Sequence, residues 1–359
     1  MGRPDIEKNQ HRPELLPPYT PEQIIGGDFT GKHIISVDQF EKNGSRSLNA
    51  LFETARRMKE RVRASDPSLP NIASGRVMAS LFFESSTRTD MSFQAAMKRL
   101  GGDVVAASNG IQFSSVYKGE NLQDTIRAAG CYADIVVLRH PEVGSSYVAA
   151  EYLDRLSNKL PDKRTTVISG GDGIGEHPTQ AMLDIFTIID KKGSIDDLRI
   201  TMVGDLKHGR TVHSLAKLIA YYGAHRVSLN LVSPHTLQMP ESIATLVERN
   251  GVSVTRTNNI TDVLRESDVI YWTRVQEERF ENPKDYEAIK NDFIITPDTM
   301  EFAHQDAILM HPLPRKQEMG TKADHDILDD DPRAVYFEQM ENGMFVRMAL
   351  LSMVMQQNL

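Results

Sequence analysis

The sequence predicts an α/β fold with two domains, each a parallel sheet flanked by helices, linked by long helices. Two observations support this prediction. Short apolar runs alternate with amphipathic helical patterns along most of the chain, as expected when each parallel strand is followed by a crossover helix. The chain also has 359 residues, which is enough for two domains with substantial cores.

The first elements precede the alternating pattern. Residues 1–32 are polar and proline-bearing, which indicates an N-terminal extension with little core of its own. An amphipathic helix is expected over Ser45–Arg63, ending before Asp66-Pro67. Its basic face is predicted to be solvated and comprises Arg56, Arg57, Lys59, Arg61 and Arg63.

Two series of strands follow. The first is predicted at Arg76–Phe83, Asp103–Ala107, Asp134–Arg139 and Arg164–Ser169. The second is predicted at Leu198–Val203, Arg226–Ser233, Ser253–Arg256, Val269–Thr273, Phe293–Ile295 and Ala307–Met310. Between the series, Pro178 opens a helix that Gly193 ends, and the domain boundary is placed in or near it.

Two further helices complete the pattern. One is expected over Ser214–Tyr222, after the first strand of the second series. The chain closes with Asn342-Gly343 and then a helix over Met344–Met355, which is apolar almost all round. Such a helix is buried, so it should pack back across one of the domains.

Composition excludes several classes of function. The net charge of −8 argues against nucleic acid or an anionic membrane surface as the main partner. The single cysteine, Cys131, rules out a disulfide framework and a cysteine-based zinc site, and favours a reducing compartment. The N-terminus lacks the apolar core of a signal peptide, and no apolar run is long enough to span a membrane. A cytoplasmic location is therefore expected.

The run Ser86-Thr87-Arg88-Thr89 is the most informative motif. It lies where the strand ending at Phe83 passes into a helix. A helix N-terminus exposes backbone N–H groups, and three hydroxyls and a guanidinium join them here, so the run predicts a phosphate site. The alternative is that the hydroxyls only cap the helix and that Arg88 is a solvated charge.

Other strand ends carry a similar chemistry. Cations, imidazoles and amides follow the predicted strands at Arg139-His140, His177–Gln180, Asp205–Arg210, Arg274–Gln276 and His311–Arg315. Because ligands bind beyond the carboxyl ends of parallel strands, these groups predict an electropositive cleft in an acidic protein. Such a cleft suits a multiply anionic substrate.

Motifs for other chemistries are missing from the sequence. The glycine-rich run at 170–175 does not fit G-x-G-x-x-G, and there is no nucleotide-triphosphate P-loop. H-E-x-x-H, G-x-S-x-G and histidines at metal-ligand spacing are also missing. No metal and no cofactor are therefore expected.

Taken together, the motifs resemble those of the transcarbamoylases, and of the aspartate branch in particular. The matching segments, in order, are 82–89 (FFESSTRT), 137–141 (VLRHP), 177–180 (HPTQ), 202–213 (MVGDLKHGRTVH), 273–276 (TRVQ) and 311–314 (HPLP). The resemblance covers roughly residues 33–359. It implies transfer of the carbamoyl group of carbamoyl phosphate to L-aspartate, in pyrimidine biosynthesis. It assigns 33–177 with the C-terminal helix 339–359 to a carbamoyl-phosphate-binding domain and 178–338 to an aspartate-binding domain.

The resemblance also implies roles for residues that meet carbamoyl phosphate. The phosphate is held by Ser86, Thr87, Arg88 and Thr89, with Arg139 assisting. Thr89, Arg139 and His177 are the catalytic residues, because they share the carbonyl oxygen as it gains negative charge. A neutral imidazole suits this role, and the positive end of a helix disfavours protonation of His177. Gln180 and the backbone carbonyls of Pro312 and Leu313 orient the carbamoyl NH2 group. The alternative for His177 is that it only caps the helix.

The aspartate subsite is implied in the same way. Arg210 pairs with one carboxylate and Arg274, beside Gln276, with the other, with Lys118 bridging. Leu313 and Pro314 complete the subsite. The segment 114–120 resembles a mobile loop that comes from a neighbouring subunit and inserts Ser114 and Lys118 into the site. A homotrimer with shared sites is therefore implied. Regulatory chains are neither indicated nor excluded.

Two alternatives remain open. An ornithine carbamoyltransferase would bind a cationic side chain, which Arg274 would repel, and that branch carries cysteine where this chain has Pro312. A transcarbamoylase-like protein that binds without catalysing should have lost cations from the cleft. All five are present here: Arg88, Arg139, Arg210, Arg274 and Lys118. The stretch 154–164 also looks longer than is usual in the family.

Overall fold

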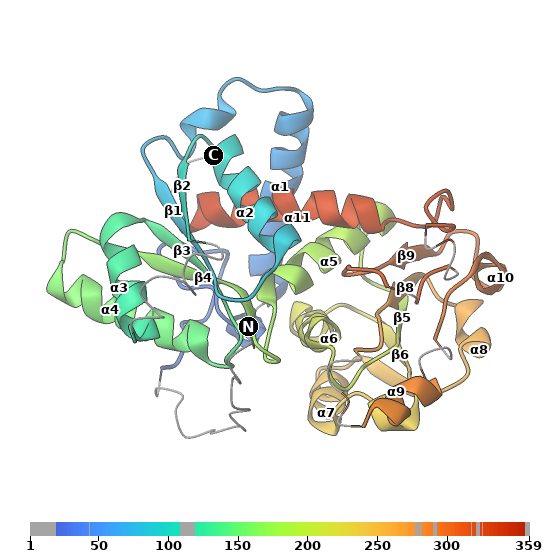
Figure 1. Cartoon of the computed structure of the whole chain (residues 1–359). Coiled ribbons are helices and arrows are strands. Elements are labelled where there is room, and N and C mark those ends of the chain that lie inside the picture. Colours follow the sequence, from blue (N-terminus) through green and yellow to red (C-terminus); the bar gives the residue numbers. More distant parts are fainter. Residues whose placement is uncertain are drawn as a thin grey trace.

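The computed structural model describes residues 19–42, 44–107, 119–276, 280, 282–289, 293–316, 318–320, 324 and 326–355. Within these ranges the chain forms two separate sheets with helices packed around them (Figure 1). Every pairing between neighbouring strands is parallel. The predicted fold class is therefore confirmed.

The first sheet has the strand order β2-β1-β3-β4. Its strands are β1 (Val77–Phe82), β2 (Asp103–Ala106), β3 (Ile135–His140) and β4 (Thr166–Asp172). The central strands β1 and β3 are almost wholly buried, as their continuous apolar runs predict, whereas the edge strand β2 is largely exposed.

The second sheet has the order β7-β6-β5-β8-β9. Its strands are β5 (Arg199–Val203), β6 (Ser228–Val232), β7 (Ser253–Thr257), β8 (Val269–Trp272) and β9 (Ile308–Met310). Each sheet changes direction of strand order once, between β1 and β3 in the first and between β5 and β8 in the second. Such switch points leave a crevice at the carboxyl ends of the strands, where ligands bind.

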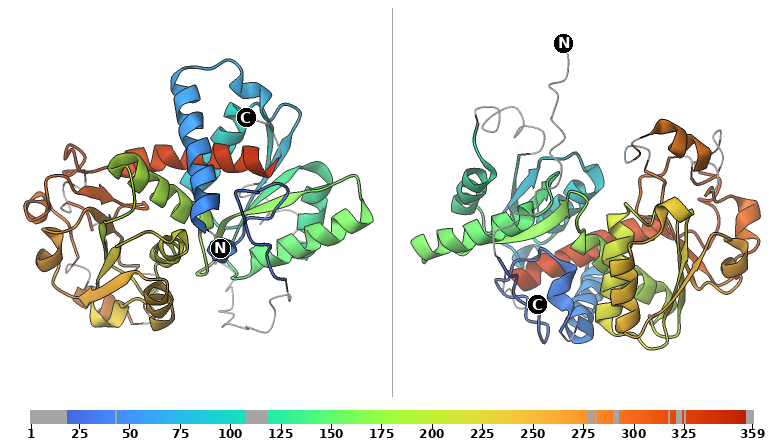
Figure 2. Two further views of the ribbon diagram at one scale, coloured as in Figure 1. Left: turned by 180° about the vertical axis from the view of Figure 1, so that it is seen from behind. Right: turned by 90° about the horizontal axis from the view of Figure 1, so that it is seen from below.

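The helices cover both sheets and connect them (Figures 1 and 2). They are α1 (Gly44–Arg63), α2 (Thr87–Arg99), α3 (Leu122–Tyr132), α4 (Ser145–Lys159), α5 (Pro178–Lys192), α6 (Arg210–Tyr222), α7 (Glu241–Arg249), α8 (Thr261–Leu264), α9 (Pro283–Ile289), α10 (Pro297–Met300) and α11 (Tyr336–Val354). Short 3₁₀ turns lie at Val37–Phe40, Leu69–Asn71 and His235–Leu237. The predicted start and stop of α5 are confirmed, with Pro178 as its first residue and Gly193 at φ +81° after its last.

The C-terminal helix α11 is longer than predicted. It begins at Tyr336, so Asn342 and Gly343, expected just ahead of it, lie inside it. Gly343 is tolerated because the helix passes close to α5 there: a Cβ would lie 3.0 Å from a methyl of Leu183. The helix packs on α1, α2, α5 and β9, so it crosses from one sheet to the other, and every residue over 345–352 is buried for that reason.

Four other findings differ from or extend the expectations. The strand expected over Phe293–Ile295 is wrong: Ile295 forms only an isolated bridge with Met319, away from the five-stranded sheet. Lys59 is not solvated, because its ammonium is buried against Asp190 at 2.7 Å.

In the N-terminal extension, Ile24 and Phe29 are buried in the large core cluster that also contains residues of α1 and α11. The first half of the 154–164 stretch continues α4.

Candidate active site

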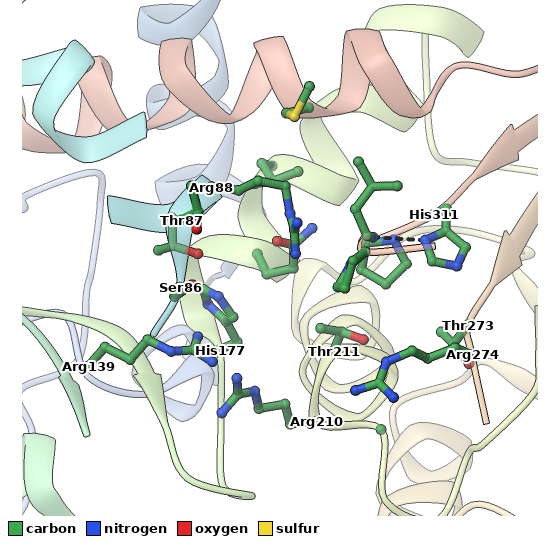
Figure 3. Close-up of a pocket in the computed structure, with 18 of the residues that line it drawn as sticks. Ser86, Thr87, Arg88, Arg139, His177, Arg210, Thr211, Thr273, Arg274 and His311 are labelled. Carbon is green, nitrogen blue, oxygen red and sulfur yellow. Dashed lines mark hydrogen bonds between the residues drawn. The ribbon is translucent and has the colours of Figure 1, made fainter. Parts of the chain in front are cut away.

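A pocket of about 460 Å³ lies between the carboxyl ends of the two sheets (Figure 3). The end of β3 and the loops that follow β1, β4, β5, β8 and β9 all contribute to its wall. Among the described residues that line it are five arginines and one carboxylate. These are Arg88, Arg139, Arg210, Arg274, Arg347 and Glu84. The predicted electropositive cleft is thus present, and it lies where the two switch points face each other.

The phosphate motif forms the N-terminus of α2. Ser86 is the N-cap residue in extended φ (−151°), and its hydroxyl makes no capping hydrogen bond to the helix. The Ser86 hydroxyl therefore does not serve as a helix cap. Ser86, Thr87 and Arg88 line the pocket, and Thr89 is buried beside them. Partial burial and the neighbouring charge of Arg139 lower the pKa of Arg88, which indicates that positive charge is concentrated here.

Arg139 projects into the pocket near the end of β3. One of its terminal nitrogens donates to the Gly170 carbonyl at 3.2 Å, and the other lies 2.9 Å from a carboxylate oxygen of Glu84. Burial lowers the pKa of this arginine, while Glu84 opposes that shift. The approach is close: a Cβ on Gly171, at φ +124°, would lie 2.7 Å from the guanidinium. Glycine at 171 therefore makes room for the cation.

His177 lies at the N-cap of α5, facing the pocket. Its backbone N–H donates to the Ser214 hydroxyl at 3.1 Å, and its side chain makes no capping hydrogen bond. Its Nδ1 atom is buried without a hydrogen-bond partner among the described residues. Burial, and then Arg210, Arg139 and Arg347, hold the pKa of the imidazole well below 6.5. The ring is therefore neutral at physiological pH, although burial contributes most to this and the helix end was the only predicted cause.

The second sheet supplies two further cations. Arg210 is the first residue of α6 and donates to the Gly173 carbonyl, and Arg274 follows β8. Figure 3 shows the guanidinium groups of Arg139, Arg210 and Arg274 pointing into the same space. Gln276 lines the pocket near Arg274.

Asp205 organises this side of the pocket. It is fully buried, and its carboxylate accepts the backbone N–H of His208 at 3.0 Å and that of Gln276 at 3.5 Å. The residue before it, Gly204, has φ +114°, and a Cβ there would lie 2.2 Å from the Thr273 carbonyl oxygen. Only glycine allows the ends of β5 and β8 to approach this closely. Asp205 then holds the loop that carries Arg210 and the one that carries Gln276.

The segment 311–314 closes the pocket on the side of β9. Leu313 has φ +53° and donates its N–H to Nδ1 of His311 at 2.8 Å. The backbone N–H of His311 in turn donates to Oε1 of Gln339 on α11, at 2.9 Å. Burial lowers the pKa of His311, so its ring is neutral and Nδ1 can accept. Pro312, Leu313 and Pro314 all line the pocket.

Comparison with known proteins identifies the family. The description "Aspartate/ornithine carbamoyltransferase, carbamoyl-P binding domain" matches residues 32–190, and "Aspartate/ornithine carbamoyltransferase, Asp/Orn binding domain" matches residues 196–354. The chain belongs to the aspartate/ornithine carbamoyltransferase family. The resemblance inferred from the motifs is therefore confirmed, while the domain boundaries drawn from it stay a prediction.

Two relatives of this carbamoyltransferase chain differ greatly in length. The chain is 46% identical over 335 residues to the multifunctional protein CAD of Squalus acanthias. That match covers 93% of this chain and 14% of the CAD protein. The chain is 42% identical to the aspartate carbamoyltransferase catalytic subunit of Methanocella arvoryzae, covering 91% of this chain and 98% of that one. The chain thus spans about a seventh of the length of the first relative and nearly all of the second.

A solved structure has the same fold. The aspartate transcarbamoylase of Trypanosoma cruzi, in complex with carbamoyl phosphate and aspartate, matches with a TM-score of 0.80 at 40% identity. The match covers 94% of this chain and 99% of that one.

The structure brings together every described residue that the carbamoyltransferase motifs predicted for the site. Ser86, Thr87, Arg88, Thr89, Arg139, His177, Gln180, Arg210, Arg274, Gln276, Pro312, Leu313 and Pro314 all line the one pocket. Ser114 and Lys118 lie outside the described residues, and the individual roles stay predictions. Within the described ranges there is no group of three or more histidines, cysteines and acids that could hold a metal ion, and no helix is long and apolar enough to cross a membrane.

Sequence reasoning missed a second group of residues around the pocket. These are Glu84, Asp184, Thr211, Tyr271, Gln339 and Arg347. Asp184 could have been noticed, because it lies four residues after Gln180 and so on the same helix face. Tyr271 and Arg347 could not, because both lie within long apolar runs whose pattern indicates only burial.

Proposed function

We propose that the chain transfers the carbamoyl group of carbamoyl phosphate to the amino group of L-aspartate, giving N-carbamoyl-L-aspartate and phosphate in pyrimidine biosynthesis. The observation that carries this proposal is the distribution of cations in one pocket. Arg88 and Arg139 lie at the switch point of the first sheet, and Arg210 and Arg274 at that of the second. One pair suits a phosphate, and the other suits the two carboxylates of aspartate.

The phosphate of carbamoyl phosphate would bind to groups that follow the strands of the first sheet. The backbone N–H groups at the start of α2, with the hydroxyls of Ser86, Thr87 and Thr89, supply donors for the phosphate oxygens. Arg139 and the neutral His177 then lie within the same wall, so both can donate to the carbonyl oxygen. Lys118 and Ser114 are proposed to join them from a neighbouring subunit.

The chemical step is an attack of the neutral amine on the carbonyl carbon. A C–N bond forms, negative charge develops on the carbonyl oxygen, and the C–O bond to phosphate then breaks. Donation from Thr89, Arg139 and His177 stabilises the charge where it develops, an effect usually worth more than any other single term. The departing phosphate can take the amine proton, so no side chain is required as a strong base. Positioning by the arginines supplies much of the remaining acceleration.

Selection of aspartate over ornithine follows from charge. Arg210 and Arg274 both face the second half of the pocket, and a cationic side chain brought there would be repelled. A binding protein without activity is disfavoured because the cations and the neutral imidazole of His177 are all present. A cytoplasmic location is part of the same proposal, on the grounds of composition alone.

The deciding experiment is an assay for carbamoylated product with carbamoyl phosphate and either aspartate or ornithine. Product is expected with aspartate only, without added metal or nucleotide. Product with ornithine alone would identify the other branch of the family. Activity that is abolished by EDTA and restored by zinc would contradict the metal-free proposal.

A homotrimer with shared sites is tested by mixing. The Arg88→Ala and Lys118→Ala chains should each be nearly inactive, whereas subunit exchange between them should restore some activity in sites that have both residues. No recovery, with exchange demonstrated by mass spectrometry of tagged chains, would place Lys118 outside a neighbour's site.

A further inference from the structure

A cluster of buried polar side chains lies against the wall of the pocket. Asp184 on α5 and Tyr271 on β8 are fully buried, and Gln339 on α11 is 1% exposed. Gln180, one turn before Asp184 on α5, is only half-buried and lines the pocket. Three separate elements thus converge on a single carboxylate, which reaches the pocket through Gln180.

The hydrogen bonds in this cluster are directional. Oδ1 of Asp184 accepts from Nε2 of Gln180 at 2.9 Å and from Nε2 of Gln339 at 2.7 Å. Oδ2 accepts from the hydroxyl of Tyr271 at 2.7 Å. A carboxylate only accepts, so it fixes which end of each amide turns toward it.

The carboxylate therefore orders two sides of the pocket at once. Since Nε2 of Gln180 is held by Asp184, the opposite end of that amide, its oxygen, is presented to a ligand. Since Nε2 of Gln339 is also held, its oxygen accepts the backbone N–H of His311 at 2.9 Å and positions the segment 311–314. Both sides then offer acceptors, Oε1 of Gln180 and the carbonyls of that segment, to an NH2 group.

We propose that Asp184 is a positioning residue that makes this part of the pocket an acceptor site, and so selects a carbamoyl group over an acyl group without an NH2. The inference rests on the proposed function, because it takes Gln180 to contact the carbamoyl group. Asp184 touches no substrate in this account and acts through Gln180 and Gln339.

The charge state of the cluster does not disturb this arrangement. Burial raises the pKa of Asp184 to about 7, against the hydrogen bonds that lower it. If Oδ2 carries the proton, it can donate to the Tyr271 oxygen, because a hydroxyl can reverse its role, while Oδ1 still accepts from both amides. Arg347 on α11 is the buried cation whose charge faces this carboxylate.

Two substitutions separate hydrogen bonding from charge. Asp184→Asn and Asp184→Leu remove the same charge near Arg347. The asparagine can keep its oxygen toward Gln180 and Gln339 and turn its NH2 toward the Tyr271 oxygen, whereas leucine offers no acceptor. Tyr271→Phe is the matched control for disturbing the cluster. It removes one hydrogen bond of Asp184 and the interactions of the hydroxyl with Thr211 and Gln180, but leaves both amides bonded to Asp184.

The experiment is calorimetric binding of two stable phosphonates, phosphonoacetamide, which carries the NH2 group, and acetonylphosphonate, which has a methyl in its place. The wild type should prefer the amide by at least about tenfold, because one hydrogen bond to a buried acceptor is at stake. In Asp184→Asn and Tyr271→Phe, the preference for the amide should stay within about threefold of the wild-type preference. In Asp184→Leu, the amide should be preferred by only about threefold or less. A general structural role would weaken both ligands equally and leave the ratio unchanged.

Several results would overturn the inference. These are a wild type that does not discriminate, an Asp184→Leu chain that keeps the wild-type ratio, or a Tyr271→Phe chain that loses as much as Asp184→Leu. Should the leucine chain fail to fold, the double variant Asp184→Asn/Tyr271→Phe replaces it. There the asparagine NH2 has no hydroxyl to donate to, so the double variant should lose more discrimination than the sum of the single ones.

The transfer assay gives a separate reading of the proposed function. A wild-type chain that binds phosphonoacetamide selectively but carbamoylates no aspartate would refute that function and leave the acceptor site standing.

Discussion

The two halves of the pocket are built differently. On the first sheet, four consecutive residues, Ser86–Thr89, line the pocket at one helix N-terminus. On the second, Arg210 and Arg274 come from two strand ends 64 residues apart in the sequence, and the buried Asp205 holds their loops in register. A phosphate can be bound by local geometry, because a helix end already presents its donors. Two carboxylates at a fixed separation require cations that tertiary structure has placed.

The largest expected effect is at His177, which lies between the two halves. His177→Ala should lower kcat by about 10²–10³, as removal of one donor to a developing oxyanion does, with carbamoyl phosphate binding little changed. Steady-state kinetics and calorimetry measure the two quantities. His177→Gln should recover part of the loss, since it restores a neutral donor. A kcat within about threefold of the wild type in His177→Ala would reduce the residue to a structural role at the start of α5.

The next largest effect is expected from loss of Arg88, the cation proposed to bind the phosphate. Arg88→Ala should weaken carbamoyl phosphate binding to the enzyme by about 10- to 100-fold, because a charge-assisted contact is worth about 1.5–3 kcal/mol. Calorimetry with inorganic phosphate should show a loss of the same order. If binding of both were unchanged, the cation at the start of α2 would not belong to the phosphate half.

A smaller and complementary effect is expected on the second sheet. Arg274→Ala should cut kcat/KM for aspartate by at least about tenfold, since it leaves one carboxylate unpaired. Binding of carbamoyl phosphate should change little. The pair of variants therefore measures how separate the halves are, and loss of carbamoyl phosphate binding in folded Arg274→Ala would contradict the division.

The smallest effect concerns the carboxylate that both sides of the pocket share. The pKa of Asp184 is about 7 in the folded chain, against 3.8 for an unperturbed aspartate, so the folded state binds more protons between these values. This contribution to stability is fully present below pH 3.8 and declines progressively until the pH has risen through about 7. Relative to Asp184→Asn, the wild type should lose at least about 1 kcal/mol of unfolding free energy between pH 5.5 and 7.5. Denaturant unfolding at one protein concentration tests this, and parallel pH profiles would contradict it.

Much of the fold could be predicted because the signals that define each element are local in the sequence. The apolar runs of β1 and β3, the proline at the start of α5 and the glycine at its end act within a few residues. The stripe of α1 was predicted equally well, but not the burial of Lys59, because its partner Asp190 is 131 residues away. Likewise Phe293–Ile295 has the composition of a strand, but Ile295 pairs with Met319 and not with a strand of the five-stranded sheet.

The sequence by itself determined the alternation of strands and helices, the run of hydroxyls and arginine at Ser86–Thr89 and which residue types stand at the strand ends. Tertiary structure alone decided that the two switch points face each other, that burial keeps His177 neutral, and that Asp184 meets Tyr271 and Gln339. The physical reason is the range of the interactions. Periodicity, capping and turn preferences act over a few residues, whereas a buried polar group finds its partner only through packing across elements distant in the chain.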